Sequence, residues 1–444
     1  MALRTDTTHR SLAASSRYVA ALAVVAIGSA VFSVSFRALL AATYASVFHA
    51  PNVVAAITSL PPPMRIVVLL TGAMLAGLVS RIGRPSRQNV SNVMEAVALG
   101  NVRLSLRTTV RRVTSSWIAI AAGLSIGREG PLIEFGGSLG AAAGRVTRLP
   151  VRWTRVLVAA GTAAGFAAAY NTPFAAALFV LETMVGIAAL EAIIPILAAV
   201  AVAAALTRAL AGAGPIYGAR AFTTTSVEEL VSFLAIAIAG AGVATLFKRA
   251  LASFERAFTR WAPQQPWRAA IGGLVVGTVA TVVPQVAGNG YEPLNQLLDG
   301  SVEMRLLMPL LLAKVVATSA SVGSGIPGGV FTPFLLVGGL MGAAWGHATS
   351  LVWDVPASHI GSYALLGMAA TTAASIHAPL TAAVLIFELS GDYAIALPLL
   401  AVTSLATMTS RALGTVSVYE AELHRRGLAW RLTLEGRHVA KRSR

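Results

Sequence analysis

The chain has 444 residues, of which 56% are hydrophobic and 12% are charged, and its mean hydropathy is +0.73. Soluble domains carry about 25% charged residues, so this composition excludes an ordinary soluble enzyme, a disordered chain and a nucleic-acid binder with a charged surface. The net charge is +16, from 34 basic and 18 acidic residues, and cysteine is absent, so a membrane protein without disulfides or thiolate metal sites is expected.

The basic residues lie in the two tails and in short connections between apolar runs. They cluster at 103–112, 145–155 and 248–260. Positive side chains concentrate at the cytoplasmic ends of membrane segments. We therefore expect a multi-pass protein of a bacterial cell (inner) membrane, with both termini in the cytoplasm, the lipid bilayer as its surroundings and no nucleic-acid partner.

The first apolar stretch runs from Tyr18 to about Phe48 and is too long for the apolar region of a signal peptide. It predicts a first membrane helix. Several later apolar runs are shorter and are interrupted by Gly and Pro, with breaks at 61–63, 127–131, 171–173, 323–333 and 377–379. Irregular backbone at membrane depth needs surrounding protein or a water-filled path, and paired broken helices are typical of a transporter binding site.

Two blocks of the sequence repeat. Residues 127–144 align without a gap with residues 329–346, at an offset of 202, and eight of the 18 positions are identical. Further along, Asn171-Thr172-Pro173 precedes Glu182 by the same spacing with which His377-Ala378-Pro379 precedes Glu388, at an offset of 206. We therefore predict an all-α polytopic membrane protein with two inverted-topology repeats of tilted and broken helices.

The predicted boundaries follow from these blocks and from the charge pattern. They comprise a single transmembrane domain over 1–427, a first repeat over about 50–210, a second over about 220–411, a polar linker at about 250–270 and a basic cytoplasmic tail over 428–444.

Gly127-Arg128-Glu129-Gly130-Pro131 places a carboxylate where a new helix begins. Free N–H groups at a helix N-terminus attract anions, so the carboxylate of Glu129 can occupy an anion position and leave it when protonated. The alternative is a helix cap paired with Arg128. The counterpart at 328–333, Gly-Gly-Val-Phe-Thr-Pro, has no acid, so the N–H groups of Val330 and Phe331 are free to receive an anion directly.

These two motifs, the Asn-x-Pro block that leads to Glu182, and Ser417-Val418-Tyr419-Glu420 together resemble the CLC chloride channel and transporter family. The resemblance runs from about residue 20 to 427. It implies a homodimer with one pore per subunit that transports a small inorganic anion, with chloride the first expectation. It also implies that Glu129 is the gating glutamate, that Gly130, Val330 and Phe331 line the anion site, and that Tyr419 supplies a phenol contact. From the residues alone, an interfacial aromatic is the favoured interpretation of Tyr419.

One departure from the family concerns the anion. Family members usually carry Gly-Ser-Gly-Ile-Pro before an early helix, where this chain has Arg87-Gln88-Asn89-Val90-Ser91. Gln88 falls on the position of the serine, with Asn89 beside it, and both are candidate anion ligands. Because the side chain and the backbone both change, selectivity for fluoride or another anion stays open.

A second departure concerns protons. Proton-exchanging relatives often have paired acids where this chain has Glu182-Thr183, and Thr cannot carry a proton by ionising. The candidate proton path comprises Glu129, Glu182 and the position of Thr183, with Glu134 or Glu191 as the substitute acid. Channel and proton-coupled exchanger both stay open.

A membrane-embedded hydrolase that uses Glu182 and Glu388 as paired acids is the alternative from another class. The sequence contains no metal-ligand spacing and no activated nucleophile. We therefore expect no enzymatic activity, no catalytic residue, no metal and no cofactor.

Overall fold

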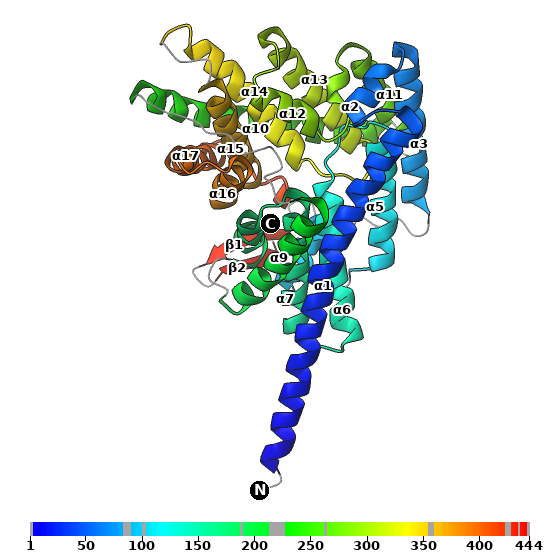
Figure 1. Cartoon of the computed structure of the whole chain (residues 1–444), viewed down its shortest axis with the longest axis vertical. Coiled ribbons are helices and arrows are strands. Elements are labelled where there is room, and N and C mark those ends of the chain that lie inside the picture. Colours follow the sequence, from blue (N-terminus) through cyan, green and yellow to red (C-terminus); the bar gives the residue numbers. More distant parts are fainter. Residues whose placement is uncertain are drawn as a thin grey trace.

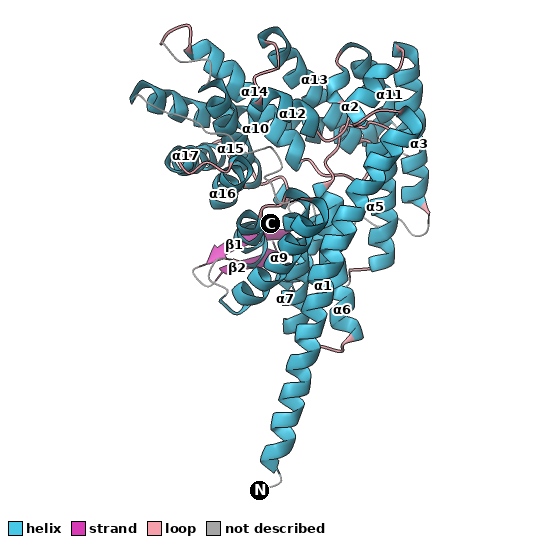
Figure 2. Cartoon of the chain, viewed as in Figure 1, coloured by secondary structure: helices cyan, strands magenta, loops and turns pink. Residues whose placement is uncertain are grey.

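The computed structural model describes residues 3–82, 90–99, 104–186, 190–212, 227–261, 264–353, 359–421, 428–433 and 436–441. Nearly all of them are helical (Figure 2), which confirms the predicted fold class. The exception is an antiparallel hairpin of β1 (Leu428–Thr433) and β2 (Gly436–Lys441), which the sequence analysis did not predict.

The first half of the chain forms helices of very unequal length. These are α1 (Leu3–Phe48), α2 (Val53–Ser59), α3 (Pro62–Arg81), α4 (Val90–Leu99), α5 (Leu106–Ala121), α6 (Glu129–Val146), α7 (Val151–Tyr170), α8 (Pro173–Val180), the π-helical turn η1 (Leu181–Val185) and α9 (Leu190–Ala211).

The second half forms a matching series. These elements are α10 (Val227–Trp261), α11 (Trp267–Val282), the 3₁₀ turn η2 (Pro284–Val286), α12 (Tyr291–Leu298), α13 (Met304–Gly323), α14 (Phe331–Thr349), α15 (Ile360–Ile376), α16 (Pro379–Ser390) and α17 (Ala396–Ala412).

The breaks between these helices fall at the Gly and Pro positions that the sequence marked. Helix α7 ends at Asn171 and α15 ends at His377, and both residues adopt the left-handed backbone conformation with φ of 56°. The next helices begin at Pro173 and Pro379, because proline fits the first turn of a helix. His377 thus caps α15 as Asn171 caps α7.

Glycines bring the central helices of each half into close contact. Helix α6 packs on α7, and α14 packs on α15. A Cβ on Gly136 would strike the carbonyl oxygen of Gly161, and a Cβ on Gly338 would strike that of Gly367. These two pairs are related by the offsets 202 and 206, so the repeated glycines encode the same close backbone packing twice.

Five described helical segments are long and apolar enough to cross a membrane. They are Ser15–Ser59, Pro62–Arg81, Glu191–Ala211, Val231–Trp261 and Met304–Gly323. The chain is thus a membrane protein with several long spans and several short, broken helices between them. Helix α1 extends along one side of the molecule and projects beyond it toward the N-terminus (Figure 1).

The segment expected to be a polar linker, 250–270, is helical over most of its length. Residues 250–261 continue α10, and residues 267–270 form the first turn of α11. The segment is polar because its side chains are exposed at the end of a helix, not because it is a loop: Arg256 and Arg260 are both exposed. The boundaries of the two repeats and of the tail remain predictions.

Candidate functional site

The two Gly-rich motifs, 202 residues apart in the sequence, meet at the centre of the fold. The N–H of Gly127 donates to the carbonyl of Gly329 over 2.6 Å, and the N–H of Gly329 donates to the carbonyl of Gly127 over 2.8 Å. Each glycine thus bonds its own counterpart in the other half. The starts of α6 and α14 are held side by side by this exchange.

Glu129 lies at this junction and is 1% exposed. The hydroxyl of Thr332, in the opposite motif, donates to Oε1 of Glu129. A Cβ on Gly127 or Gly329 would press against Oε2, so the two glycines leave the space that this oxygen fills. The carboxylate of Glu129 therefore lies between the two helix starts, as expected for a carboxylate in an anion position.

Oε2 of Glu129 is buried and has no hydrogen-bond partner among the residues that the structure describes. Arg128 does not supply one, because its guanidinium carbon lies 5.6 Å from the centre of the Tyr291 ring. The geometry therefore does not show the alternative, in which Glu129 caps the helix and pairs with Arg128. An unsatisfied carboxylate oxygen is costly to bury, which favours a side chain that can leave this position.

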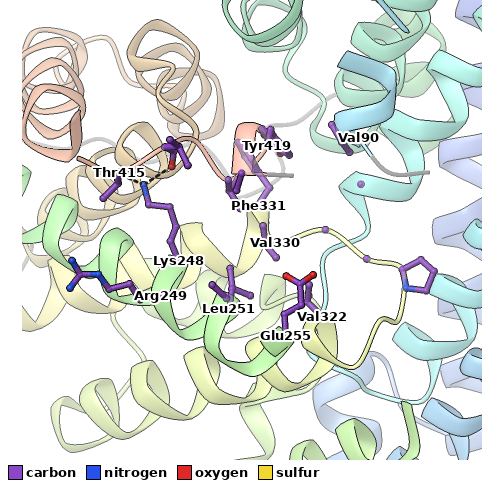
Figure 3. Close-up of a pocket in the computed structure, with 18 of the residues that line it drawn as sticks. Val90, Lys248, Arg249, Leu251, Glu255, Val322, Val330, Phe331, Thr415 and Tyr419 are labelled. Carbon is purple, nitrogen blue, oxygen red and sulfur yellow. Dashed lines mark hydrogen bonds between the residues drawn. The ribbon is translucent and has the colours of Figure 1, made fainter. Parts of the chain in front are cut away.

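A cavity of about 610 Å³ opens next to this junction. Its wall includes Gly130, Val330, Phe331 and Tyr419, four of the predicted anion-binding residues. Figure 3 shows Val330, Phe331 and Tyr419 close together. Val330 and Phe331 lie at the start of α14, and Tyr419 lies in the segment that follows α17. Gln88 and Asn89, the other two predicted ligands, lie outside the described residues.

Aromatic rings connect two of these residues. The ring of Phe179, on α8, meets the rings of Tyr419 and Phe331 edge to face, with centroid distances of 5.7 and 6.5 Å. Tyr419 is therefore packed in the interior beside the cavity and not on a lipid-facing surface. The sequence analysis missed Phe179, because a Phe in an apolar helix carries no distinguishing signal.

Glu134 also lines the cavity. It is 4% exposed, and its Oε1 accepts a hydrogen bond from Nε of Arg112, on α5, over 3.1 Å. Arg112 lines the same cavity. The sequence pointed to Glu134 as a substitute acid but gave no sign of its basic partner, because the two residues belong to different helices.

Glu182 is engaged elsewhere. Its carboxylate accepts hydrogen bonds from the N–H groups of Leu380 (3.3 Å) and Thr381 (2.8 Å) at the start of α16. Thr183 is 2% exposed, and its hydroxyl donates to the carbonyl of Phe179. Neither residue lines the cavity that contains Glu134.

Glu388 makes the reciprocal contact in the other half. It accepts from the N–H groups of Phe174 (3.1 Å) and Ala175 (2.7 Å) at the start of α8. Each glutamate thus caps the broken helix of the opposite repeat, where the helix dipole stabilises a negative charge. These contacts do not bring Glu182 and Glu388 to one shared cavity, as the hydrolase alternative requires.

No group of three or more His, Asp or Glu residues that could hold a metal ion occurs in the part of the chain that the structure describes. The arrangement places backbone N–H groups at two helix starts and the phenol of Tyr419, which suit a small anion, close to the carboxylate of Glu129.

Comparison with known proteins agrees with this geometry. Residues 71–411 match the profile of the voltage-gated chloride channel family. A protein of Ralstonia nicotianae described as a ClcB-like chloride channel is 36% identical over 380 residues, which cover 84% of this chain and 89% of that protein.

Two solved structures share the fold. A slow cyanobacterial Cl⁻/H⁺ antiporter has a TM-score of 0.82 at 22% identity, and the match covers 92% of this chain and 98% of the other. A CLC-type fluoride/proton antiporter has a TM-score of 0.68 at 21% identity and is matched over 97% of its length, with 92% of this chain covered. The family match over most of the sequence and the shared helical architecture lead to one conclusion: this chain belongs to the CLC family of voltage-gated chloride channels.

Proposed function

We propose that this protein transports a small inorganic anion, chloride in the first place, through a pathway formed where the starts of α6 and α14 meet. The observation that carries the proposal is the buried carboxylate of Glu129 between the two motif glycines, with one oxygen unsatisfied. A site that accepts a carboxylate at helix N-termini is suited to a dehydrated halide, because backbone dipoles stabilise the ion without a fixed charge that would trap it.

In this proposal Glu129 is the gate. Ionised, it occupies the anion position and accepts from Thr332; protonated or displaced by an anion, it leaves. On the cavity side the ion meets the helix starts at Gly130, Val330 and Phe331 and the phenol of Tyr419. The location of these four residues on one cavity wall supports the assignment.

Chloride is favoured over fluoride by the Ralstonia nicotianae relative, which is 36% identical and is described as a chloride channel. Selectivity for another anion is the alternative, because Gln88 presents an amide where the family usually has a serine hydroxyl. Chloride transport and fluoride transport both occur among proteins of this fold, as the two antiporter structures illustrate.

We further propose weak or absent proton coupling. Thr183 cannot ionise, and Glu182 is held by the start of α16. The alternative, an exchanger, is supported by Glu134, because this acid lies on the same helix as Glu129 and lines the cavity. Glu134 would then take the place of the missing inner acid, with Arg112 controlling its charge.

The proposed assembly is a homodimer with one pathway in each subunit. Helices α8 and α16 pack on each other and have only eight and 12 residues, too few to cross a bilayer of about 30 Å. Large apolar side chains are nevertheless exposed on this face, among them Phe174 on α8 and Leu397 and Met408 on the neighbouring α17. A second copy would cover these short helices.

The proposed location is a bacterial inner membrane with both termini in the cytoplasm. Arg17, about four turns into α1, donates to the carbonyl of Thr147 over 3.4 Å, so this part of α1 lies beside the basic cluster at 145–155. Two arginine-rich segments thus lie at one end of the molecule, in agreement with the excess of positive charge on cytoplasmic sides.

The test is a flux assay on protein reconstituted in liposomes under a chloride gradient, with chloride efflux and external pH recorded together, and then repeated with fluoride. Chloride efflux without uphill proton movement supports the proposal as it stands. Proton movement against its own gradient, driven by chloride, would replace it by exchange through Glu134. Efflux of fluoride but not chloride would reverse the selectivity.

A further inference from the structure

Lys248, on α10, is the centre of a hydrogen-bond cluster beside the cavity. Its Nζ donates to the carbonyls of Ala374 (3.1 Å) and Val416 (3.2 Å) and to Oγ1 of Thr415 (2.8 Å), with Oγ of Ser410 at 3.4 Å. Thus one ammonium group joins α10 to the last turns of α15 and α17 and to the segment that follows α17.

That segment carries Tyr419. Val416 lies three residues before it, and the N–H of Val418 donates to the carbonyl of Ser375 over 2.9 Å, next to the Ala374 carbonyl that Lys248 binds. The chain that leads to the phenol is therefore tied to the end of α15 by the backbone hydrogen bond of Val418 and by Lys248. The hydroxyl of Thr415 also lies 3.5 Å from Nε2 of His377, the residue that caps α15.

A positive charge fits this place for a physical reason. The ends of α15 and α17 converge there, and the carbonyl groups of a helix C-terminus carry partial negative charge. Ammonium offers three donors and can satisfy several such acceptors at once. The described hydrogen bonds of Lys248 go to carbonyl and hydroxyl oxygens, and the charge of Glu420 also acts on its ammonium group.

We propose that Lys248 is a positioning residue for the anion pathway: it fixes the segment 413–418 and thereby places Tyr419 against Phe179 on the cavity wall. The inference rests on the proposed function, because it presumes that Tyr419 contacts the anion. It extends the control of anion discrimination to α10, a helix that lies outside the sequence motifs.

Arg249 provides a matched control. It is the next residue, carries the same charge and lines the same cavity, but it is exposed and makes no hydrogen bond among the described residues. Figure 3 shows the ammonium of Lys248 directed at the Thr415 segment and the guanidinium of Arg249 directed away from it. Loss of charge alone and loss of the tether can thus be separated by two neighbouring substitutions.

The experiment measures the chloride-to-nitrate flux ratio, the maximal flux and the apparent chloride affinity in liposomes for Lys248→Met, Lys248→Arg, Arg249→Gln and Tyr419→Phe. We expect Lys248→Met and Tyr419→Phe to shift the ratio in the same direction by about two- to tenfold, the effect of one hydrogen bond. Combining them should add little further shift. Lys248→Arg should restore part of the ratio, and Arg249→Gln should leave it unchanged.

The possible results separate the anion contact of Tyr419 from the positioning role of Lys248. If Tyr419→Phe leaves the ratio and the affinity unchanged, the anion contact of Tyr419 fails, and the inference fails with it. If Tyr419→Phe shifts the ratio but Lys248→Met does not, or if Arg249→Gln shifts it equally, only the positioning role of Lys248 is refuted. Should Lys248→Met fail to fold, Thr415→Val removes the shortest contact of Lys248 and must shift the ratio in the same direction.

Discussion

Arg112 and Lys314 are 202 residues apart, the offset that relates the two halves, and each lies on the helix that precedes a Gly-rich motif. Their partners differ. Arg112 pairs with Glu134 over 3.1 Å, whereas Lys314 is fully buried and donates to the carbonyls of Val286 (2.9 Å) and Gly288 (2.8 Å). The position equivalent to Glu134 in the second half is Leu336, so the repeat preserves the basic residue but not the acid.

Loss of one partner of the Arg112–Glu134 pair should destabilise the protein more than loss of both partners. Removing one member of a buried ion pair leaves an uncompensated charge and costs about 3–5 kcal/mol. We expect Arg112→Met to lower the thermal unfolding midpoint in detergent markedly, and the double variant Arg112→Met/Glu134→Leu to recover most of the loss. A double variant no better than the single one would show that the two charges are not coupled.

Lys314→Met should destabilise the turn that follows α11. The substitution keeps the length of the side chain but leaves the carbonyls of Val286 and Gly288 without their donor, at a cost of about 2 kcal/mol. Thermal unfolding in detergent checks this. Leu312→Ala, at a 60% exposed position on the same helix, is the control and should cost less.

Glu129→Ala should leave anion flux intact or raise it, and should remove its dependence on pH. The carboxylate that occupies the anion position, and that protonation would release, is then gone. Liposome efflux at several external pH values measures both properties. Persistence of the full pH dependence in the variant would refute the gating role.

Gly127→Ala should act like a weaker form of Glu129→Ala. The added Cβ would collide with Oε2 of Glu129, so the carboxylate must leave the position between the two motif glycines. We expect a higher basal flux and a smaller response to acid. Gly242→Ala is the control, because a Cβ there meets no atom within 4 Å and the backbone at this position is not left-handed. Unchanged flux in Gly127→Ala would mean that the observed Glu129 position does not block the path.

Gln88→Ser should change the order in which anions permeate. The substitution replaces an amide by the shorter hydroxyl that the family usually places there, which alters the donor presented to the ion. Flux measured in parallel with chloride, bromide, nitrate and fluoride gives the order for each protein. The same order in both would indicate that Gln88 does not touch the ion.

The membrane class, the broken helices and the pairing of the two halves were all determined by the sequence itself. They depend on local properties: apolar runs, Gly and Pro at helix ends, and repeated spacing. The glycines at 136 and 338 were visible as aligned identities, although the close contacts that require them, with Gly161 and Gly367, were not. The position of Glu129 at a helix start was likewise readable from Gly-Arg-Glu-Gly-Pro.

The partners of these residues were decided only by the tertiary structure. Thr332 lies 203 residues from the Glu129 that it binds, Glu182 caps a helix 198 residues further along, and Lys248 reaches a loop 167 residues away. Such contacts depend on how the two inverted halves pack, and no local pattern encodes them. The motif predicts Glu182 on a proton path, and only the tertiary structure shows that its carboxylate also accepts hydrogen bonds from the start of α16. A carboxylate in a repeated motif can gate, cap or carry protons, and its neighbours from distant helices determine which.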